Sequence, residues 1–371
     1  MKNKIYKYDF LVVGGGLIGS LAALALLKKN YTVLVIEKNN LDIKDDRTLA
    51  VNANSREFLK NLGLWQKLNP NSESINKIII GDYINSNNLF FDQKNESMGS
   101  VIYNRDLLSL VHNKLLKNNL IYKKIKINLS SLNENQVINI NKKKFLFKKI
   151  ILSLGKNYKE TSLISKINFQ SNHYAYVGFF NHKKNHNNFA YEYFTKNGPL
   201  AVLPAPKKNK RYSTFIFSTK NYHSKNNIKK LLQKYFNNSH GLINLDKKIN
   251  NFPINPHISK TIDNNYLLIG DTLRSIHPVA GQGWNLGIKD IQELLYVVEA
   301  TPLEHIDFTN FYYSRRTFDN VSYLAFTSLL NKFYEKQSIF NKFIIKTGFQ
   351  TLRKFSSLRN LFIKQAMGKL I

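Results

Sequence analysis

The chain has 371 residues, of which 43% are hydrophobic and 13% aromatic, and it contains no cysteine. This length and composition are typical of a globular enzyme with a large buried core and two domains, and they exclude a disordered chain. The absence of cysteine excludes disulfides, thiolate metal sites and cysteine nucleophiles, and no metal centre is predicted.

The formal net charge is +31, from 55 Lys and Arg against 24 Asp and Glu. A clustered basic patch would indicate nucleic acid or an anionic membrane surface. Here the lysines are scattered along the chain beside many asparagines, as in the run 142–144, and no nucleic-acid recognition motif accompanies them. Most of these charges are therefore interpreted as solvated, and no nucleic-acid partner is predicted.

The first predicted element is a strand that runs into a glycine-rich turn and then a helix. An apolar run at 10–13 leads into Gly14-Gly-Gly16-Leu-Ile-Gly19, and helix-forming residues follow at 21–26. In this G-x-G-x-x-G pattern, Gly14 permits the tight turn, Gly16 lets a pyrophosphate approach the backbone, and Gly19 lets helix and strand pack closely. The phosphates would lie at the helix N-terminus, where unpaired N–H groups favour an anion.

A second buried strand is predicted at 31–36, and it ends at Glu37. A carboxylate about 20 residues beyond the glycines is where a nucleotide ribose hydroxyl is accepted. The uncharged stretch 10–27 is long enough to imitate a membrane span, but its three consecutive glycines argue against one. The pattern therefore predicts a nucleotide-binding unit in a soluble or peripheral protein.

The middle of the chain has a different pattern of predicted helices and strands. Helices are predicted at 55–63, where a glycine provides the stop, and at 104–116, and a short strand is predicted at 148–154. Between about 170 and 261, short aromatic and β-branched runs such as 174–180 indicate an antiparallel sheet. One face of such a sheet is suited to roof a pocket for an apolar, aromatic substrate.

A second glycine-rich region follows this sheet. A strand from Tyr266 leads into Gly270-Asp271, and His277-Pro-Val-Ala-Gly-Gln-Gly-Trp-Asn-Leu-Gly287 comes shortly after. Either glycine region alone leaves the cofactor open, but the two together predict FAD and redox chemistry. The predicted divisions are a discontinuous FAD-binding domain (1–75, 100–165 and 262–325), an inserted β-sheet substrate domain (76–99 and 166–261) and C-terminal basic helices (326–371).

The C-terminal segment 324–371 carries nine Lys or Arg against a single acid, Glu335. Apolar residues recur in it at helical spacing, for example Phe355, Leu358 and Phe362. A basic amphipathic helix of this kind either lies on a membrane with its apolar face toward the lipid, or packs on the domain as a core helix with its basic face in solvent. The sequence leaves both alternatives open.

These motifs resemble the ubiquinone-biosynthesis flavin hydroxylases, the UbiH-type family of the para-hydroxybenzoate hydroxylase fold. The resemblance spans nearly the whole chain and is carried by the opening glycines with Glu37, the run 198–204, Gly270-Asp271, the specific segment 277–287 and the closing segment 361–368. It implies an α/β fold, with a FAD-binding Rossmann-like domain of glutathione-reductase type, an inserted antiparallel β-sheet substrate domain and C-terminal helices.

The resemblance also implies an activity and a setting. Family members use FAD, NAD(P)H and O2 to hydroxylate the aromatic ring of a polyprenylated phenol. We therefore expect a cytoplasmic protein that is peripheral on the inner face of the cytoplasmic membrane and contacts it through the C-terminal basic helices. Other ubiquinone-biosynthesis proteins are further candidate partners.

Carried over by resemblance, Asp271 hydrogen-bonds the ribityl chain of FAD, and the backbone of Gly281–Gly283 lies against the flavin ring. Arg47 matches the family's arginine in the loop near the isoalloxazine, and Arg105 matches the helix-start arginine near FAD. By their own chemistry, Asp271 and Arg105 are equally suited to be a helix cap and a surface salt-bridge partner. The predicted cofactor-binding residues are Gly14, Gly16, Gly19, Glu37, Arg47, Arg105, Asp271, Gly281, Gln282, Gly283 and Asn285, with Arg47 and Pro278 near the flavin ring.

Elementary chemistry agrees with a flavin at this place. Reduced flavin carries negative charge around N1, and a helix beginning near Gly283 would present N–H groups and its positive dipole end to that charge. The reactive oxygen must be kept from water, which an apolar sheet roof achieves. Because the cofactor holds the reactive group, no general base is named, and His277 is interpreted as a structural turn residue.

Three positions depart from the family pattern. At 153–155 the chain has Ser-Leu-Gly where the family has Ala-Asp-Gly, and Leu154 puts efficient nicotinamide use in doubt because the family's acid takes part in cofactor and nicotinamide interactions. At 272–274 it has Thr-Leu-Arg in place of Ala-Ala-His, which is expected to alter the pocket edge. Asn30 replaces a glycine, a smaller change because Asn tolerates left-handed backbone angles.

Three other functions compete with hydroxylation. Another flavin reaction on the same scaffold, such as halogenation or reduction of an isoprenoid chain, would share the glycine motifs. Leu154 also suits a non-catalytic member that binds FAD, or has only the fold, and serves as a scaffold in a quinone-biosynthesis assembly. A basic nucleic-acid-binding protein would show steeply salt-dependent binding and no yellow colour.

Overall fold

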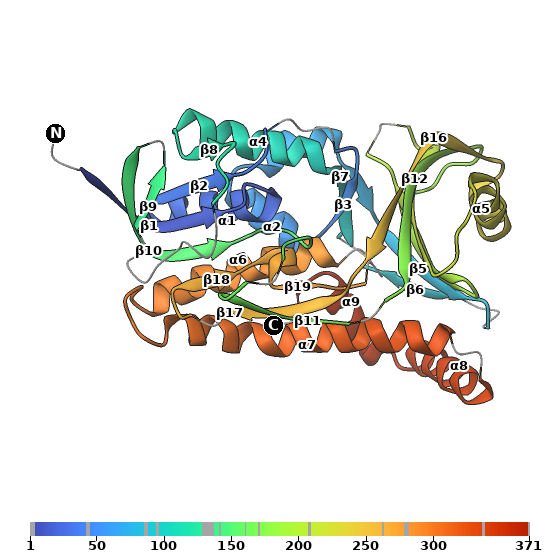
Figure 1. Cartoon of the computed structure of the whole chain (residues 1–371). Helices are drawn as coiled ribbons and strands as arrows, with labels where there is room; N and C mark the ends of the chain where they lie inside the picture. Colours follow the sequence, from blue (N-terminus) through green and yellow to red (C-terminus); the bar gives the residue numbers. More distant parts are fainter. Residues whose placement is uncertain are drawn as a thin grey trace.

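The structure of the chain, a computed structural model, places two large sheets at opposite ends of the molecule, with a long helix, α7 (Phe308–Glu335), running beneath both (Figure 1). It describes residues 4–41, 45–84, 88–93, 96–127, 137–140, 142–159, 161–169, 171–206, 209–261, 263–277, 282–335 and 338–369.

The first large sheet is mostly parallel. Its strands are β1 (Ile5–Val13), β2 (Val33–Glu37), β8 (Ile121–Lys123), β9 (Val137–Ile140), β10 (Lys143–Leu152) and β18 (Tyr266–Leu268). The spatial order is β18-β10-β1-β2-β8, all pairs parallel, and β9 adds to β10 in the antiparallel sense. Helices and loops bury both faces, which explains the nearly continuous apolar runs of β1 and β2. The register sets Val13 opposite Leu152, so the turns that follow these two strands are neighbours.

Helices cover one face of this sheet. They are α1 (Leu17–Lys28), α4 (Asn104–Lys117) and α6 (Gly283–Ala300). Phe10, Leu21, Leu107 and Ile291 are fully buried in the core between these helices and the strands. A second core on the other face contains Leu11, Phe147 and Tyr266. Because β18 joins the sheet from far downstream, the sheet is built from separate parts of the sequence.

The second large sheet has seven strands in the order β16-β12-β15-β14-β13-β5-β6. Its strands are β5 (Lys77–Asp82), β6 (Leu89–Asp92), β12 (His173–His182), β13 (Phe189–Thr195), β14 (Gly198–Pro204), β15 (Tyr212–Thr219) and β16 (Ile243–Ile254). Helix α5 (Lys225–His240) packs on it through Ile228, Leu232 and Phe236, which share a core with Phe180 and Phe215. The predicted antiparallel sheet is confirmed except for one pair, because β13 and β5 run parallel. These strands fall within 76–99 and 166–261, and the domain boundaries stay predictions.

Two three-stranded sheets lie beside the large ones. One consists of β3 (Thr48–Asn52), β7 (Gly99–Tyr103) and β4 (Glu73–Ile75), and the other of β11 (Ile164–Asn168), β17 (His257–Thr261) and β19 (Arg274–Ser275). The fold class predicted from the sequence is thus confirmed.

Several local predictions are also confirmed. The helix expected at 55–63 is α2 (Ala53–Asn61), and Gly63 follows it with a φ of +65°. The helix expected at 104–116 is α4, and Asn30 adopts a φ of +66° in the turn after α1. Gly63 after α2 and Asn30 after α1 thus both adopt left-handed backbone angles. This conformation costs little free energy for Gly and is tolerated by Asn.

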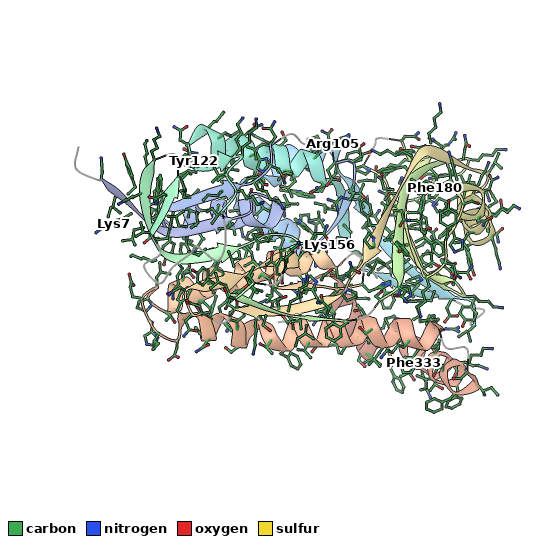
Figure 2. All side chains as sticks on the ribbon, viewed as in Figure 1. Lys7, Arg105, Tyr122, Lys156, Phe180 and Phe333 are labelled. Atoms are coloured by element: carbon green, nitrogen blue, oxygen red, sulfur yellow. The ribbon has the colours of Figure 1, made fainter. Side chains whose placement is uncertain are left out.

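The C-terminal segment folds into helices that pack on the protein with one face. After α7 come α8 (Ile339–Lys354) and α9 (Ser356–Ala366). Tyr334, Ile345, Phe349, Ile363 and Met367 are buried in a core shared with the seven-stranded sheet. Other side chains project outward around α8, near the labelled Phe333 (Figure 2). Among the described helices, none combines the length and the apolar composition that crossing a membrane requires.

Candidate active site

One cleft of about 1290 Å³ joins the two glycine regions. Gly14 and Gly16 of the first region and Gly283 and Trp284 of the second line it, and so do Val177 and Ile216 of the seven-stranded sheet. Lys156, which also lines it, lies between the two large sheets (Figure 2). Segments more than 250 residues apart thus form a single site, as an extended dinucleotide requires.

The three glycines of the first motif occupy three different environments. Gly14 has a φ of +109°, and a Cβ on it would lie 2.1 Å from the carbonyl oxygen of Ser153. A Cβ on Gly19 would lie 2.1 Å from the carbonyl oxygen of Gly14, so helix and strand meet at backbone distance. A Cβ on Gly16 would meet nothing within 4 Å, because this residue faces the cleft. Two glycines serve the turn and the packing, and the third leaves space for a ligand.

The N-terminus of α1 is free to bind an anion. Gly16 is its N-cap residue, with extended backbone, no side-chain cap bond and no acid in the first turn. The first N–H groups of a helix have no partner within the helix, and the helix dipole adds partial positive charge there. Both features fit the pyrophosphate of FAD.

Glu37 holds the position predicted for the ribose acceptor. Its Oε2 accepts a hydrogen bond from the N–H of Gly15 at 2.8 Å, and its Oε1 accepts one from the N–H of Asn39 at 2.8 Å. These bonds fix the carboxylate at the edge of the cleft, at the end of β2. Each carboxylate oxygen retains capacity for a further hydroxyl donor.

The carbonyl of Gly15 is held by two side chains that the sequence did not single out. His112 of α4 donates from Nε2 at 2.7 Å, and Ser20 donates from its hydroxyl at 2.9 Å. Since a carbonyl oxygen only accepts, the proton of His112 is on Nε2. Burial lowers the pKa of His112, so the ring is neutral near pH 7. These two bonds hold the backbone of the glycine-rich turn at Gly15 in place.

Asp271 projects into the cleft from a short 3₁₀ turn, η3 (Gly270–Thr272). Its side chain is exposed to the cleft, yet surrounding protein raises the pKa of its carboxyl group, against the opposing charges of Arg274, Lys156 and Arg47. The alternative role as a helix cap is not seen, because neither η3 nor α6 has a side-chain cap bond. An exposed carboxylate facing a cleft is suited to accept the hydroxyls of a ribityl chain.

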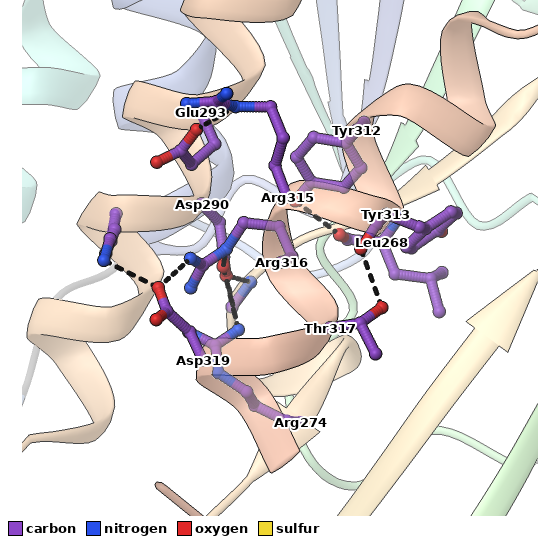
Figure 3. A network of polar contacts seen from close by, with 12 residues as sticks. Leu268, Arg274, Asp290, Glu293, Tyr312, Tyr313, Arg315, Arg316, Thr317 and Asp319 are labelled. Atoms are coloured by element: carbon purple, nitrogen blue, oxygen red, sulfur yellow. Dashed lines mark hydrogen bonds and ion pairs between the residues drawn. The ribbon is translucent and has the colours of Figure 1, made fainter. Parts of the chain in front are cut away.

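A buried ionic network lies behind the Gly270–Asp271 turn (Figure 3). Asp290 of α6 accepts from the N–H of Gly270 at 2.9 Å, from Arg274 at 2.7 and 2.9 Å, and from Arg316 of α7 at 2.8 Å. Arg316 also donates to Asp319 at 2.7 Å. Asp290 and Arg316 are 0% exposed and Arg274 is 4% exposed, so water does not compensate these charges.

The location of Arg274 corrects one expectation. The substitution at 272–274 was expected to alter the pocket edge, but Arg274 is not among the described residues that line the cleft. Its guanidinium turns inward to Asp290, while Ser275 and Ile276 line the cleft instead. Arg274 therefore supports the turn from within the protein.

The N-terminus of α6 provides the second anion-binding end. A Cβ on Gly283 would meet nothing within 4 Å, and α6 has no side-chain cap bond at Gln282 and no acid in its first turn. These N–H groups are suited to the negative edge of a reduced flavin ring. Pro278 and Gly281, also predicted to lie near the ring, are outside the described residues.

Asn285 has a supporting position. Its Oδ1 accepts from the N–H of Asn52 at 3.1 Å, and its Nδ2 donates to the carbonyl of Ala50 at 2.9 Å, so it ties α6 to β3. It is buried and does not belong to the described lining of the cleft. Its predicted contact with the cofactor stays a prediction.

The two predicted arginines have different surroundings. Arg47 lines the cleft, donates to Asp45 at 2.6 to 3.0 Å and lies 5.7 Å from the ring centre of Phe252. The hydrogen bond to Asp45 raises the pKa of Arg47. Arg105 instead pairs with Asp46 at the surface and is not part of the described lining. This is the surface salt bridge that was the alternative for Arg105, and its contact with FAD stays a prediction.

His277 is a buried neutral residue. It is 4% exposed, neither ring nitrogen has a hydrogen-bond partner among the described residues, and its ring packs edge-on against His173 at 5.4 Å. Burial, and then the charge of His173, lower the pKa of His277 to about 3. It does not belong to the described lining of the cleft. This location agrees with a structural role and offers no general base.

The lining of the cleft has an apolar part and a charged part. The sheet wall is apolar, and Leu154, which follows β10, also lines the cleft. The charged residues of the described lining are the cations Lys38, Arg47, Lys126, Lys156 and Lys159 and the acids Glu37 and Asp271. This excess of cations suits a dinucleotide with a doubly charged pyrophosphate.

The comparisons with known proteins agree with this geometry. A family model described as FAD binding domain matches residues 7–104 and 160–300. The chain belongs to this FAD-binding family. Together these matches cover both glycine regions and every strand of the seven-stranded sheet.

Two curated relatives match nearly the whole chain. The ubiquinone hydroxylase UbiL of Rhodospirillum rubrum is 24% identical over 403 residues, covering 98% of this chain and 90% of the relative. The mitochondrial ubiquinone biosynthesis monooxygenase COQ6 of Dictyostelium discoideum is 23% identical, covering 100% of this chain and 93% of the relative. The resemblance to ubiquinone-biosynthesis flavin hydroxylases is confirmed by these matches.

A solved structure supports the fold. The p-nitrophenol 4-monooxygenase PnpA of Pseudomonas putida DLL-E4 superposes with a TM-score of 0.74 at 14% sequence identity, covering 98% of this chain and 99% of that one. At this level of identity the likeness concerns the fold alone.

Proposed function

We propose that this chain is a FAD-dependent monooxygenase that hydroxylates the aromatic ring of a polyprenylated phenol in ubiquinone biosynthesis, using NAD(P)H and O2. The observation that carries the proposal is the single cleft that joins a phosphate-binding turn, a free helix N-terminus and an apolar sheet wall. The curated relatives named as ubiquinone hydroxylases favour hydroxylation over halogenation or prenyl reduction on the same scaffold.

Different residues of the cleft would bind different parts of FAD. Gly16 and the α1 N-terminus would hold the pyrophosphate, Glu37 the adenosine ribose, and Asp271 the ribityl chain. Bound FAD supplies the redox chemistry that activates oxygen for transfer to the ring. The N–H groups at Gly283 would stabilise negative charge at the flavin edge.

The sheet wall would receive the substrate. Ala175, Val177, Ile216 and Ile254 present an apolar surface to the cleft, and Phe252 adds an aromatic face. Such a wall binds a phenol ring through apolar contact and keeps water from the reacting atoms. The chain residues therefore orient the substrate and exclude water, and no described side chain is assigned as general base.

Leu154 favours one second candidate, a FAD-binding scaffold without turnover. It replaces the acid that the resembled family uses in cofactor and nicotinamide interactions, and its N–H donates to the hydroxyl of Thr272 at 2.6 Å. In this candidate the cleft binds FAD, but NAD(P)H is not consumed.

One experiment separates the two candidates. The purified chain is examined by absorption spectroscopy, and the flavin band is then followed under anaerobic conditions after addition of NADH or NADPH. A flavin band that nicotinamide bleaches, followed by a hydroxylated product from a prenylated phenol and O2, supports the hydroxylase. A stable flavin band that neither nicotinamide bleaches, with a prenylated phenol present, supports the scaffold, and a protein without flavin contradicts both.

We further propose that the protein is cytoplasmic and peripheral on the inner face of the cytoplasmic membrane, where a polyprenylated phenol would reside. The basic C-terminal helices support this placement, and other ubiquinone-biosynthesis proteins are proposed as further partners. Fractionation of cells into soluble and membrane pools, with and without high salt, tests the location.

A further inference from the structure

Helix α7 and the start of α8 leave a row of large apolar side chains uncovered. The exposed fractions are 79% for Phe318, 50% for Val321, 48% for Phe326, 52% for Leu329, 90% for Ile339, 68% for Phe340 and 66% for Phe343. We call these seven residues the aromatic patch. A monomeric soluble protein rarely exposes so many large apolar side chains together, and such patches mark interaction surfaces.

The patch has a definite orientation because of the helical period. On α7, residues 318, 321, 326 and 329 fall on one side of the helix, whereas Arg316 and Asn320 point inward and are fully buried. Helix α7 runs along the outside of the whole molecule, and α8 lies at its far end (Figure 1). The apolar stripe therefore belongs to a long outer edge that is free to lie flat on a surface.

The surroundings of the patch are cationic. From Phe318 to the end, the sequence has nine Lys or Arg and two acids, Asp319 and Glu335. Lys332, Lys342 and Lys346 are exposed beside the patch, and none of the three forms an ion pair within the described part of the chain. Two copies of this surface would bring like charges together, whereas anionic lipid headgroups complement them.

We propose that the aromatic patch inserts into the interface of an anionic lipid bilayer, with α7 and the first turn of α8 lying parallel to the membrane plane. The phenylalanines enter the boundary between headgroups and acyl chains, and the flanking lysines contact the headgroups. The inference deepens the membrane location proposed above and rests on it for the choice of leaflet. It extends the contact from the basic helices at 326–371 to Phe318 and Val321 of α7.

The test uses the full chain loaded with FAD and vesicles of phosphatidylcholine with or without phosphatidylglycerol. The patch variant is Phe340→Ser with Phe343→Ser, and the matched control is Tyr222→Ser with Leu242→Ser, which removes two residues of 84% and 70% exposure near α5. We expect the wild type and the control to float with anionic vesicles and the patch variant to lose about tenfold or more in affinity. A charge variant, Lys342→Glu with Lys346→Glu, is expected to lose binding to anionic vesicles as well.

Two outcomes would overturn the proposal. The first is equal vesicle binding by the patch variant and the wild type. The second is a wild type that is dimeric by light scattering and becomes monomeric in the patch variant, since the patch would then cover a second copy. Circular dichroism confirms that each variant is folded. The flavin spectrum and its bleaching by NAD(P)H without vesicles report on the proposed reaction separately, so a failure of either proposal is recognised by itself.

Discussion

Asp290 of α6 accepts a hydrogen bond from the backbone N–H of Gly270, with 2.9 Å between the two atoms. This bond links the helix whose N-terminus faces the cleft to the turn that presents Asp271. The carboxylate of Asp290 is also paired with two arginines, Arg274 of β19 and Arg316 of α7. The relative positions of Asp271 and the α6 N-terminus thus depend on one buried anion.

The first prediction concerns this anion. Asp290→Asn leaves two buried guanidinium groups with reduced compensation, so we expect the free energy of unfolding to fall by about 3–5 kcal/mol. Urea denaturation of the FAD-free protein measures it. The control is Glu299→Gln, which removes an exposed ion pair with Lys29 and is expected to cost at most about 1 kcal/mol. Equal losses in the two variants would contradict the supporting role of Asp290.

The second prediction contrasts two glycines of the first motif. Gly16→Ala adds a methyl group that touches no protein atom but occupies the space where the pyrophosphate approaches. We expect a folded protein whose FAD affinity is lower by about tenfold or more, equivalent to about 1.4 kcal/mol. Titration of the FAD-free variant with FAD, followed by flavin fluorescence, measures the affinity.

Gly14→Ala is the matched comparison. Its added Cβ would lie 2.1 Å from the carbonyl oxygen of Ser153, on a backbone with a φ of +109°. We expect this variant to unfold at a lower temperature even without FAD, unlike Gly16→Ala. If Gly16→Ala bound FAD as tightly as the wild type, the phosphate site would not lie at this turn.

These glycines also show what the sequence was able to predict. The strand, the turn at Gly14 and the helix after Gly16 follow from neighbouring residues, because period and steric limits act locally. The prediction that Gly283 lies in the same cleft rested on one assumption, that each glycine region binds part of one cofactor. The general architecture and the path of the cleft were therefore accessible from motifs and their order.

The support of the site was less accessible. Arg316 reaches Asp290 because α7 crosses α6 at one particular face, and no local pattern in the sequence fixes that crossing. His112 and Phe252 reach the cleft region through tertiary packing in the same way. Arg105 is the opposite case. Its motif predicted a place in the site, but it pairs with Asp46 and is not part of the described lining of the cleft.

The third prediction concerns Asp271, whose carboxylate faces the cleft and caps no described helix. Asp271→Asn is expected to reduce FAD affinity by about tenfold, because the ribityl hydroxyls lose a charged acceptor. The unfolding free energy of the FAD-free protein should not fall, because the protein surrounding the cleft raises the pKa of Asp271 and the fold therefore does not stabilise its charge. A variant with unchanged FAD affinity would remove Asp271 from the cofactor site.

The last prediction concerns pH and a histidine cluster beneath the seven-stranded sheet. His182 and His240 pack with ring centres 4.5 Å apart, and burial, then His182 and His186, lower the pKa of His240 to about 3 from 6.5. Below about pH 6.5 the unfolded chain binds a proton that folded His240 does not, so stability present above that pH is lost on acidification. Between pH 7 and pH 5 the loss due to His240 should be about 2 kcal/mol. His240→Phe, in an aromatic surrounding, should reduce this pH dependence by that amount in urea denaturation. An unaltered pH dependence in His240→Phe would show that another group causes the acid sensitivity.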